Sequence, residues 1–321
     1  MTLQLSDQFR FGVLTKHNRK TTGPWQPGPN DMRDMVELID NAGYDSLWVG
    51  DHLAFTVPVL DPLIQLAQAA TYSSRLELGV SVYLLPLRHT GPAAKQIATL
   101  DHLSDGRLIL GVGVGGEFKD DFHVAGVDPS ERGARLNEGI QVLRKLWSGD
   151  TVSHDGKYFA FPELKMSPPA RQPNGPPIWC GGRSPAALRR AGELCDGWLS
   201  YVVTPEMYAD ALTKINDAAG DGPDRPFGTG HLLFAWVDDS YEAALDKATE
   251  SLSLRYAMDF REAAKKYCAL GRAEDVAEKL QAYHDAGLRH AIMDFVGPMA
   301  EHDAQVTRFA DEVFPLMKSF R

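Results

Sequence analysis

Short runs of apolar residues alternate with amphipathic stretches along most of the chain. Four apolar runs in the first third predict strands at 9–15, 46–51, 76–86 and 107–115. Their nearly continuous Val, Leu and Ile content is typical of parallel strands that are buried on both faces. The segments between them have apolar residues at helical spacing, and the first of these helices should end at Gly43. This part of the chain therefore predicts repeated strand–helix units.

The same alternation returns after residue 176. Apolar runs predict four more strands, at 177–182, 196–202, 230–238 and 289–297. Helices are expected from Ser184, from Pro205, from Tyr241, over 272–287 and at the C-terminus. About eight such units with no linker and no repeat predict a single α/β domain over residues 1–321, a (β/α)8 TIM barrel. A doubly wound open sheet is the alternative.

One segment interrupts this pattern. Residues 132–147 form the clearest amphipathic helix, and a turn signal at Asp155-Gly156 between β-prone flanks then predicts a hairpin. The Pro-rich residues 167–177 cannot form a regular helix. We therefore expect 148–176 to be an excursion inserted in the barrel after its fourth strand. Residues 257–271 are less regular and are a possible lid.

Composition and charge narrow the class of protein. The 321 residues are 44% hydrophobic and 24% charged, which is ordinary for a globular protein. The three cysteines form no CxxC and no even set, as expected for a reducing, cytoplasmic location. A net charge of −10 disfavours nucleic acid as a partner. The sequence has no signal-peptide pattern at its start and no apolar stretch of the roughly 20 residues that a membrane helix needs.

The second predicted strand ends in Asp51-His52. In a (β/α)8 barrel, the active site lies at the carboxyl ends of the strands. A histidine can exchange a proton near neutral pH or hydrogen-bond a ligand. The structural alternative is that Asp51 caps a helix and His52 is merely its neighbour. The position at a strand end favours a functional role for His52.

The fifth predicted strand is followed by Gly181, Gly182, Arg183 and Ser184, with Pro185 next. Ser184 and Pro185 fit the cap and first position of a helix. The N–H groups at a helix start can bind a phosphate, and Arg183 adds a cation. An ordinary capped turn is the alternative, but the combination favours an anion site. It is no Walker A loop, because GxxxxGK[ST] is absent.

The stretch "RLILGVGVGGE" at 107–117 ends the fourth predicted strand with Gly111, Gly113 and Gly116 in a loose GxGxxG pattern. Glycine leaves bare backbone that a planar ring or another chain can approach closely. Close packing between the strand and a neighbouring helix is the alternative. Glu117 follows as a general acid or as a solvated side chain, and the residues alone leave this open.

The sequence lacks the motifs of other common enzyme classes. The ten histidines include no HxH or HExxH, so no metal site is predicted, and GxSxG is absent. A phosphate-binding isomerase or aldolase barrel would share the anion site, but no predicted strand ends in the lysine that a Schiff base needs. A flavin-binding barrel without activity is a further alternative.

Four segments resemble the bacterial luciferase-like superfamily of flavin- and deazaflavin-dependent oxidoreductases. They are "GYDSLWVGDH" (43–52) and the segments 78–115, 131–147 and 176–198. The resemblance covers nearly the whole chain, and together these segments are specific for the family. They do not specify a substrate.

The resemblance implies roles for the residues that match the family's motifs. It places His52, with Asp51 beside it, at the reaction centre. It implies a non-prolyl cis peptide between Ser81 and Val82 that supports the flavin ring from behind. The matches beside the ring plane are Gly113, Val114 and Gly115, and those at the cofactor phosphate are Gly181, Gly182, Arg183 and Ser184.

The cofactor implied is F420 or FMN. In luciferase an arginine that helps to hold the FMN phosphate stands where this chain has Val114, and this departure favours members that use F420. In that case hydride transfer is expected, with His52 or Glu117 handling the proton. The alternative is an FMN-dependent two-component monooxygenase fed by a separate flavin reductase. The family commonly forms homodimers.

Further possible lid segments are 53–60, 117–130 and 148–176, and their aromatic residues give the remaining hint about the substrate. These residues are Phe55, Phe118, Phe122 and Tyr158. They indicate an apolar or aromatic small molecule.

Overall fold

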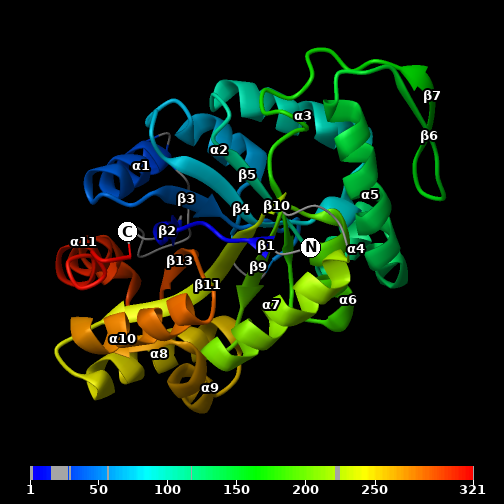
Figure 1. Cartoon of the computed structure of the whole chain (residues 1–321). Helices are drawn as coiled ribbons and strands as arrows, with labels where there is room; N and C mark the ends of the chain where they lie inside the picture. Colours follow the sequence, from blue (N-terminus) through cyan, green and yellow to red (C-terminus); the bar gives the residue numbers. More distant parts are fainter. Residues whose placement is uncertain are drawn as a thin grey trace.

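Eight parallel strands close into a barrel in the computed structural model, which describes residues 3–15, 28, 30–55, 58–116, 118–220 and 225–320 (Figure 1). Around the barrel the strands are β2 (Arg10–Leu14), β3 (Ser46–Val49), β4 (Glu77–Tyr83), β5 (Leu108–Val112), β8 (Ile178–Gly181), β9 (Gly197–Tyr201), β11 (Gly228–Val237) and β13 (His290–Phe295). Because β11 pairs with both β9 and β13, and β13 pairs with β2, these eight strands form a closed ring. The predicted (β/α)8 barrel is confirmed, and the open-sheet alternative is wrong.

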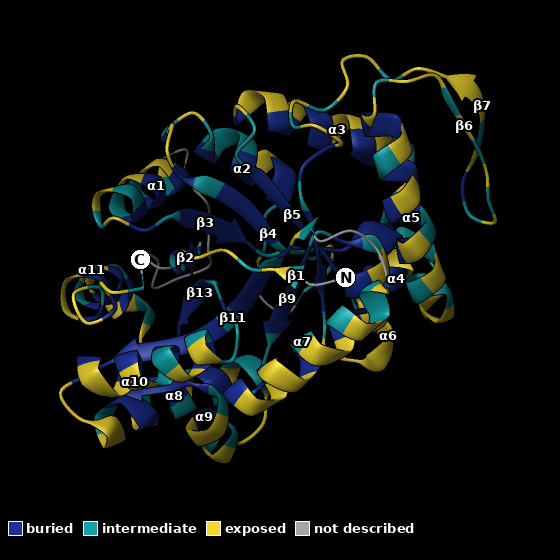
Figure 2. Cartoon of the chain, in the orientation of Figure 1, coloured by how far each residue is buried: buried dark blue, intermediate teal, exposed yellow. Residues whose placement is uncertain are grey.

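Helices surround the barrel and bury only their inner faces (Figure 2). They are α1 (Asp31–Asn41), α2 (Pro62–Ala69), α3 (Thr90–Leu103), α5 (Arg132–Trp147), α6 (Pro185–Leu194), α7 (Pro205–Ala219), α8 (Tyr241–Tyr256), α10 (Ala273–Asp285) and α11 (His302–Val313). The expected end of the first helix is confirmed, because Gly43 follows it with φ +80°. Among the helices of the described residues, none combines the length and apolar character that crossing a bilayer requires.

One side chain from each barrel strand contributes to an inner apolar layer. The eight are Leu14, Trp48, Val82, Ile109, Trp179, Leu199, Leu232 and Ile292. Two of the eight are indoles, and glycines on other strands of the barrel make room for them. A Cβ at Gly79 would lie 2.2 Å from the Trp48 ring, and one at Gly228 would lie 2.3 Å from the Trp179 ring. The barrel is therefore a packed core beneath its carboxyl rim.

The expected excursion is a hairpin that extends away from the barrel (Figure 1). Its antiparallel strands β6 (Val152–Asp155) and β7 (Ala160–Leu164) lie between α5 and β8. The connection spans 156–159, which is longer than a two-residue turn at Asp155-Gly156. Glu138 of α5 fixes this connection, since its carboxylate accepts hydrogen bonds from the backbone N–H groups of Tyr158 and Phe159.

Two segments differ from the expected pattern. Residues 119–125 form a short helix, α4 (Lys119–Ala125), although their sequence shows no long apolar period. The less regular 257–271 contains α9 (Arg261–Tyr267) and β12 (Ala269–Gly271), and β12 pairs with β11. The remaining short elements are β1 (Leu3–Gln4), β10 (Arg225–Pro226), η1 (Leu85–Leu87), η2 (Pro129–Glu131) and η3 (Met299–Glu301).

Candidate active site

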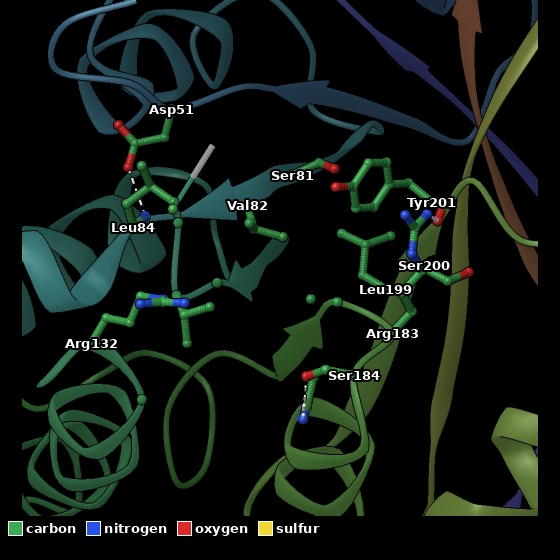
Figure 3. A pocket seen from close by; sticks show the side chains of 18 of the residues that line it. Asp51, Ser81, Val82, Leu84, Arg132, Arg183, Ser184, Leu199, Ser200 and Tyr201 are labelled. Carbon is green, nitrogen blue, oxygen red and sulfur yellow. Dashed lines mark hydrogen bonds between the residues drawn. The ribbon is translucent and has the colours of Figure 1, made fainter. Parts of the chain in front are cut away.

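The carboxyl ends of the strands surround a cavity of about 700 Å³ (Figure 3). Every described residue that the sequence predicts for the site lines this cavity. These residues are Asp51, His52, Ser81, Val82, Gly113, Val114, Gly115, Gly181, Gly182, Arg183 and Ser184. Glu117 lies outside the described residues. The structure brings the predicted residues together at one rim, while their roles in binding and catalysis stay predictions.

His52 follows β3 and is held by three groups. Its Nδ1 lies 2.9 Å from Oδ2 of Asp121 on α4. Its ring stacks on Phe55 with centroids 4.0 Å apart, and the edge of Phe118 meets it at 5.6 Å. The imidazole is 23% exposed, and no described residue hydrogen-bonds Nε2. His52 can therefore exchange a proton with a molecule in the cavity through Nε2.

Asp51 serves as an anchor within the protein. Its side chain is fully buried and forms a two-point contact with Arg88, both distances being 2.7 Å. It also accepts a hydrogen bond from the Leu84 N–H at 2.8 Å (Figure 3). Burial raises the pKa of the Asp51 carboxyl, and the Arg88 guanidinium opposes that shift. The helix-cap alternative is wrong, because Asp61 caps the next helix.

The predicted cis peptide between Ser81 and Val82 is confirmed. The pairing of β4 with β5 shifts register across these residues, and Val82 projects toward the cavity (Figure 3). A Cβ at Gly113 would lie 2.3 Å from Val82 Cγ2, and one at Gly181 would lie 2.8 Å from Val82 Cγ1. The Val82 side chain therefore occupies the space that both glycines leave.

This contact also explains why β5 carries glycines. A Cβ at Gly111 would lie 2.1 Å from the Val80 carbonyl oxygen, so the glycine lets β4 approach closely. At Gly113 the space is taken by Val82. Both glycines therefore let a neighbouring strand, and not the expected helix, pack closely against β5, while Gly113 also lines the cavity, so the approach of a planar ring there stays a prediction.

The β8–α6 connection has the geometry predicted for an anion site. The Ser184 side chain caps α6 by accepting a hydrogen bond from the Ala187 N–H at 3.3 Å, and Pro185 is the first helical residue. Gly182 has φ +106°, a conformation that favours glycine. Ala186 also lines the cavity, and no described residue accepts a hydrogen bond from its N–H. The start of α6 thus offers a donor and a favourable dipole to an anion.

Three arginines line this part of the cavity. Arg183 donates to the Val202 carbonyl at 2.8 Å, and Arg132 at the start of α5 donates to the Pro129 carbonyl at 2.6 Å. Arg190 of α6 is buried and donates to Asn137. Within the described ranges, none of the three contacts a carboxylate. We call these three arginines and residues 181–186 the anion side, and His52, Asp121, Phe55 and Phe118 the histidine side.

Sequence reasoning missed several lining residues, among them Asp121, Arg132, Arg190 and Tyr256. Arg190 lies within the segment 176–198 that carries the family resemblance, and its spacing from Ser184 could have indicated it. Asp121 gave no such signal, because the helix that carries it was not expected. In the parts of the chain that the structure describes, no three His, Cys, Asp or Glu side chains group as a metal site.

The fold and the cavity define a barrel with a histidine, three arginines and the start of a helix at the same rim. The model of the luciferase-like monooxygenase family matches residues 9–290. The chain belongs to this family and is a luciferase-like oxidoreductase.

Two relatives and one solved structure show the range of the family. The chain is 27% identical to the F420-dependent glucose-6-phosphate dehydrogenase of Nakamurella multipartita, over 92% of this chain and 94% of that protein. It is 31% identical to 4-hydroxyprotoasukamycin monooxygenase of Streptomyces nodosus subsp. asukaensis, over 73% and 66% of the two chains. Monooxygenase RslO1 from Streptomyces bottropensis has the same fold, with a TM-score of 0.82, 22% identity and coverage of 95% and 99%.

Proposed function

We propose that this protein is an F420-dependent oxidoreductase that transfers a hydride between the deazaflavin and a small organic substrate. The observation that carries this choice is the anion side, where Arg132, Arg183 and Arg190 have no carboxylate partner among the described residues. FMN ends in a single phosphate, whereas the F420 side chain continues beyond its phosphate into carboxylates. Three unneutralised guanidinium groups favour the more anionic molecule.

The residues present fit such a group. Val82 would support the ring, and the Ala186 N–H with the α6 dipole would hold the phosphate. Arg132 and Arg183 would pair with the carboxylates, because their guanidinium groups keep N–H donors beyond those that contact carbonyl oxygens. When bound, F420 supplies the carbon that accepts or donates the hydride.

His52 would handle the proton that accompanies the hydride. Its Nε2 would accept a proton from a substrate hydroxyl during oxidation, or return one to a carbonyl oxygen during reduction. Glu117 remains a second candidate for this role.

The surroundings of His52 favour a neutral, partly apolar substrate. Phe55 and Phe118 contact each other edge to face at 4.4 Å and contact the imidazole. The other two aromatic residues expected near the substrate are elsewhere, since Phe122 is buried and Tyr158 lies on the hairpin connection. The carboxylates of Asp51 and Asp121 are satisfied by protein donors, so neither is left to pair with a charged substrate.

Titration of the protein with oxidised F420 and with FMN, followed by their absorbance and fluorescence, tests this proposal. We expect saturable F420 binding that is at least tenfold tighter than FMN binding, because the anion side matches the longer anionic chain. Tight FMN binding without F420 binding would overturn the choice. That result would favour a two-component monooxygenase, and a flavin reductase would then be the expected partner.

Two further features belong to this proposal. A homodimer is expected from the family resemblance, and light scattering of the purified protein would test it. A reducing, cytoplasmic location is supported by Cys180, Cys195 and Cys268, which are all buried free thiols.

A further inference from the structure

We propose that Asp121 is a positioning residue that holds His52 in the tautomer with the proton on Nδ1. Nε2 is then the atom that takes and returns the proton. The importance of this tautomer for turnover rests on the proposed function, whereas the tautomer itself can be measured without cofactor or substrate.

The hydrogen bonds of Asp121 determine which nitrogen carries the proton. Oδ1 accepts from the backbone N–H groups of Leu53 and Ala54, at 2.7 and 2.8 Å. Oδ2 remains for Nδ1 of His52, at 2.9 Å. An ionised carboxylate can only accept hydrogen bonds, so Nδ1 must donate. In a neutral imidazole, Nε2 is then the unprotonated nitrogen.

The position of the ring is fixed independently. Phe55 lies parallel to the imidazole, with an interplanar angle of 9°, and Phe118 meets it at 86°. The Asp121 side chain is 3% exposed, so water competes little for its oxygens. A half-turn of the ring would replace the Nδ1 hydrogen bond by a C–H group and leave the buried carboxylate oxygen without its donor. Packing and hydrogen bonding thus favour the same orientation.

This arrangement supplies a base that is ready to act. When a substrate alcohol is oxidised, its carbon loses a hydride to the cofactor and its hydroxyl loses a proton to Nε2, which leaves a carbonyl group. The imidazolium that forms lies beside the Asp121 carboxylate, which stabilises the added charge. In the reverse direction the same proton returns from Nε2 to the carbonyl oxygen.

Asp121→Asn tests the proposal because the two backbone donors fix how the amide sits. Leu53 and Ala54 keep the amide oxygen, so the NH2 group faces Nδ1, which must then accept. The expected result is a reversed tautomer with the proton on Nε2. Nitrogen-15 NMR of histidine-labelled protein with neutral imidazoles distinguishes the two tautomers, and His52→Asn assigns the signals.

Asp120→Asn is the matched control. It makes the same chemical change at the neighbouring residue of the same helix, whose side chain is exposed. We expect it to leave the His52 signals unchanged. A wild-type protein with the proton on Nε2, or an Asp121→Asn protein with an unchanged tautomer, would overturn the proposal. If Asp121→Asn does not fold, the wild-type spectrum alone decides. F420 titration of the same samples tests the proposed function separately.

Discussion

The two sides of the cavity are built in different ways. The anion side comes largely from one continuous stretch, since Gly182, Arg183 and Ser184 connect β8 to α6 and Arg190 lies on α6. The histidine side joins residues that are far apart, because His52 and Asp121 are 69 positions apart along the chain. A site made from one stretch can be interpreted from local sequence, whereas a site made by long-range contact requires the fold.

The largest expected difference between the sides is in catalysis. His52→Ala should slow F420-dependent turnover by about 10²–10⁴-fold, because it removes the group that handles the proton. The Kd for F420 should change less than about threefold, since the anion side is untouched. Stopped-flow absorbance for turnover and a fluorescence titration for the Kd measure the two effects. His123→Ala, at an exposed position on α4, is the control.

A loss of F420 binding as large as the loss of turnover in His52→Ala would show that the two sides do not act separately.

Acid should destabilise β3, which precedes His52, and β9, which pairs with β8 on the anion side. His290 bonds to Ser46 of β3 and His231 to Ser200 of β9, each at 2.7 Å, and burial lowers both pKa values from 6.5 to about 3. The unfolded chain therefore binds protons that the folded chain does not, so stability is full above about pH 6.5 and falls as the pH drops. We expect a loss of about 2 kcal/mol between about pH 6 and about pH 5 for the two histidines together.

Urea unfolding at several pH values measures this loss. His231→Gln should remove about half of the pH dependence, and His123→Gln, at an exposed position, should not change it. An unaltered slope in His231→Gln would show that β9 carries none of the effect.

The packing of Val82 against Gly113, between the two sides of the cavity, should not tolerate a larger residue at position 113. Gly113→Ala places a Cβ against Val82 and should lower the free energy of unfolding by about 1–3 kcal/mol. Gly50→Ala is the control, since a Cβ there meets no atom within 4 Å although the residue lines the same cavity. Adding Val82→Ala to Gly113→Ala should restore part of the loss, and a double variant less stable than Gly113→Ala would contradict the packing explanation.

The smallest expected effect is on the anion side. Arg183→Gln should raise the Kd for F420 about tenfold, equivalent to about 1.4 kcal/mol, and leave turnover at saturating F420 unchanged. Isothermal titration at low and high salt measures the change, and the variant should lose part of the salt dependence. The control is Arg189→Gln, at an exposed position of α6 that does not line the cavity. This variant should bind F420 as the wild type does.

Local signals predicted much of the fold. The barrel strands were evident as apolar runs, and the Ser184 cap was evident because a helix start depends on neighbouring residues. The helix α4 was missed because its seven residues are too few to show a period. The role of Asp121 was missed with it.

The glycines of β5 show a different limit. Their spacing indicated that bare backbone was needed, but it could not tell what approaches it. The answer depends on Val80 and Val82, which lie on another strand and reach Gly111 and Gly113 only once the register of β4 is known. The sequence alone thus indicates that a glycine is required at a position, but it does not show which residue packs against that glycine.

Val82, Gly113 and Gly181 form one packing unit that spans three neighbouring strands. In an evolving lineage, substitutions at these three positions therefore depend on one another. We expect a bulkier residue at 113 or 181 to be tolerated only after position 82 has become smaller. Anyone who redesigns this enzyme for a wider ligand should mutate the trio in a combined library rather than scan each position alone.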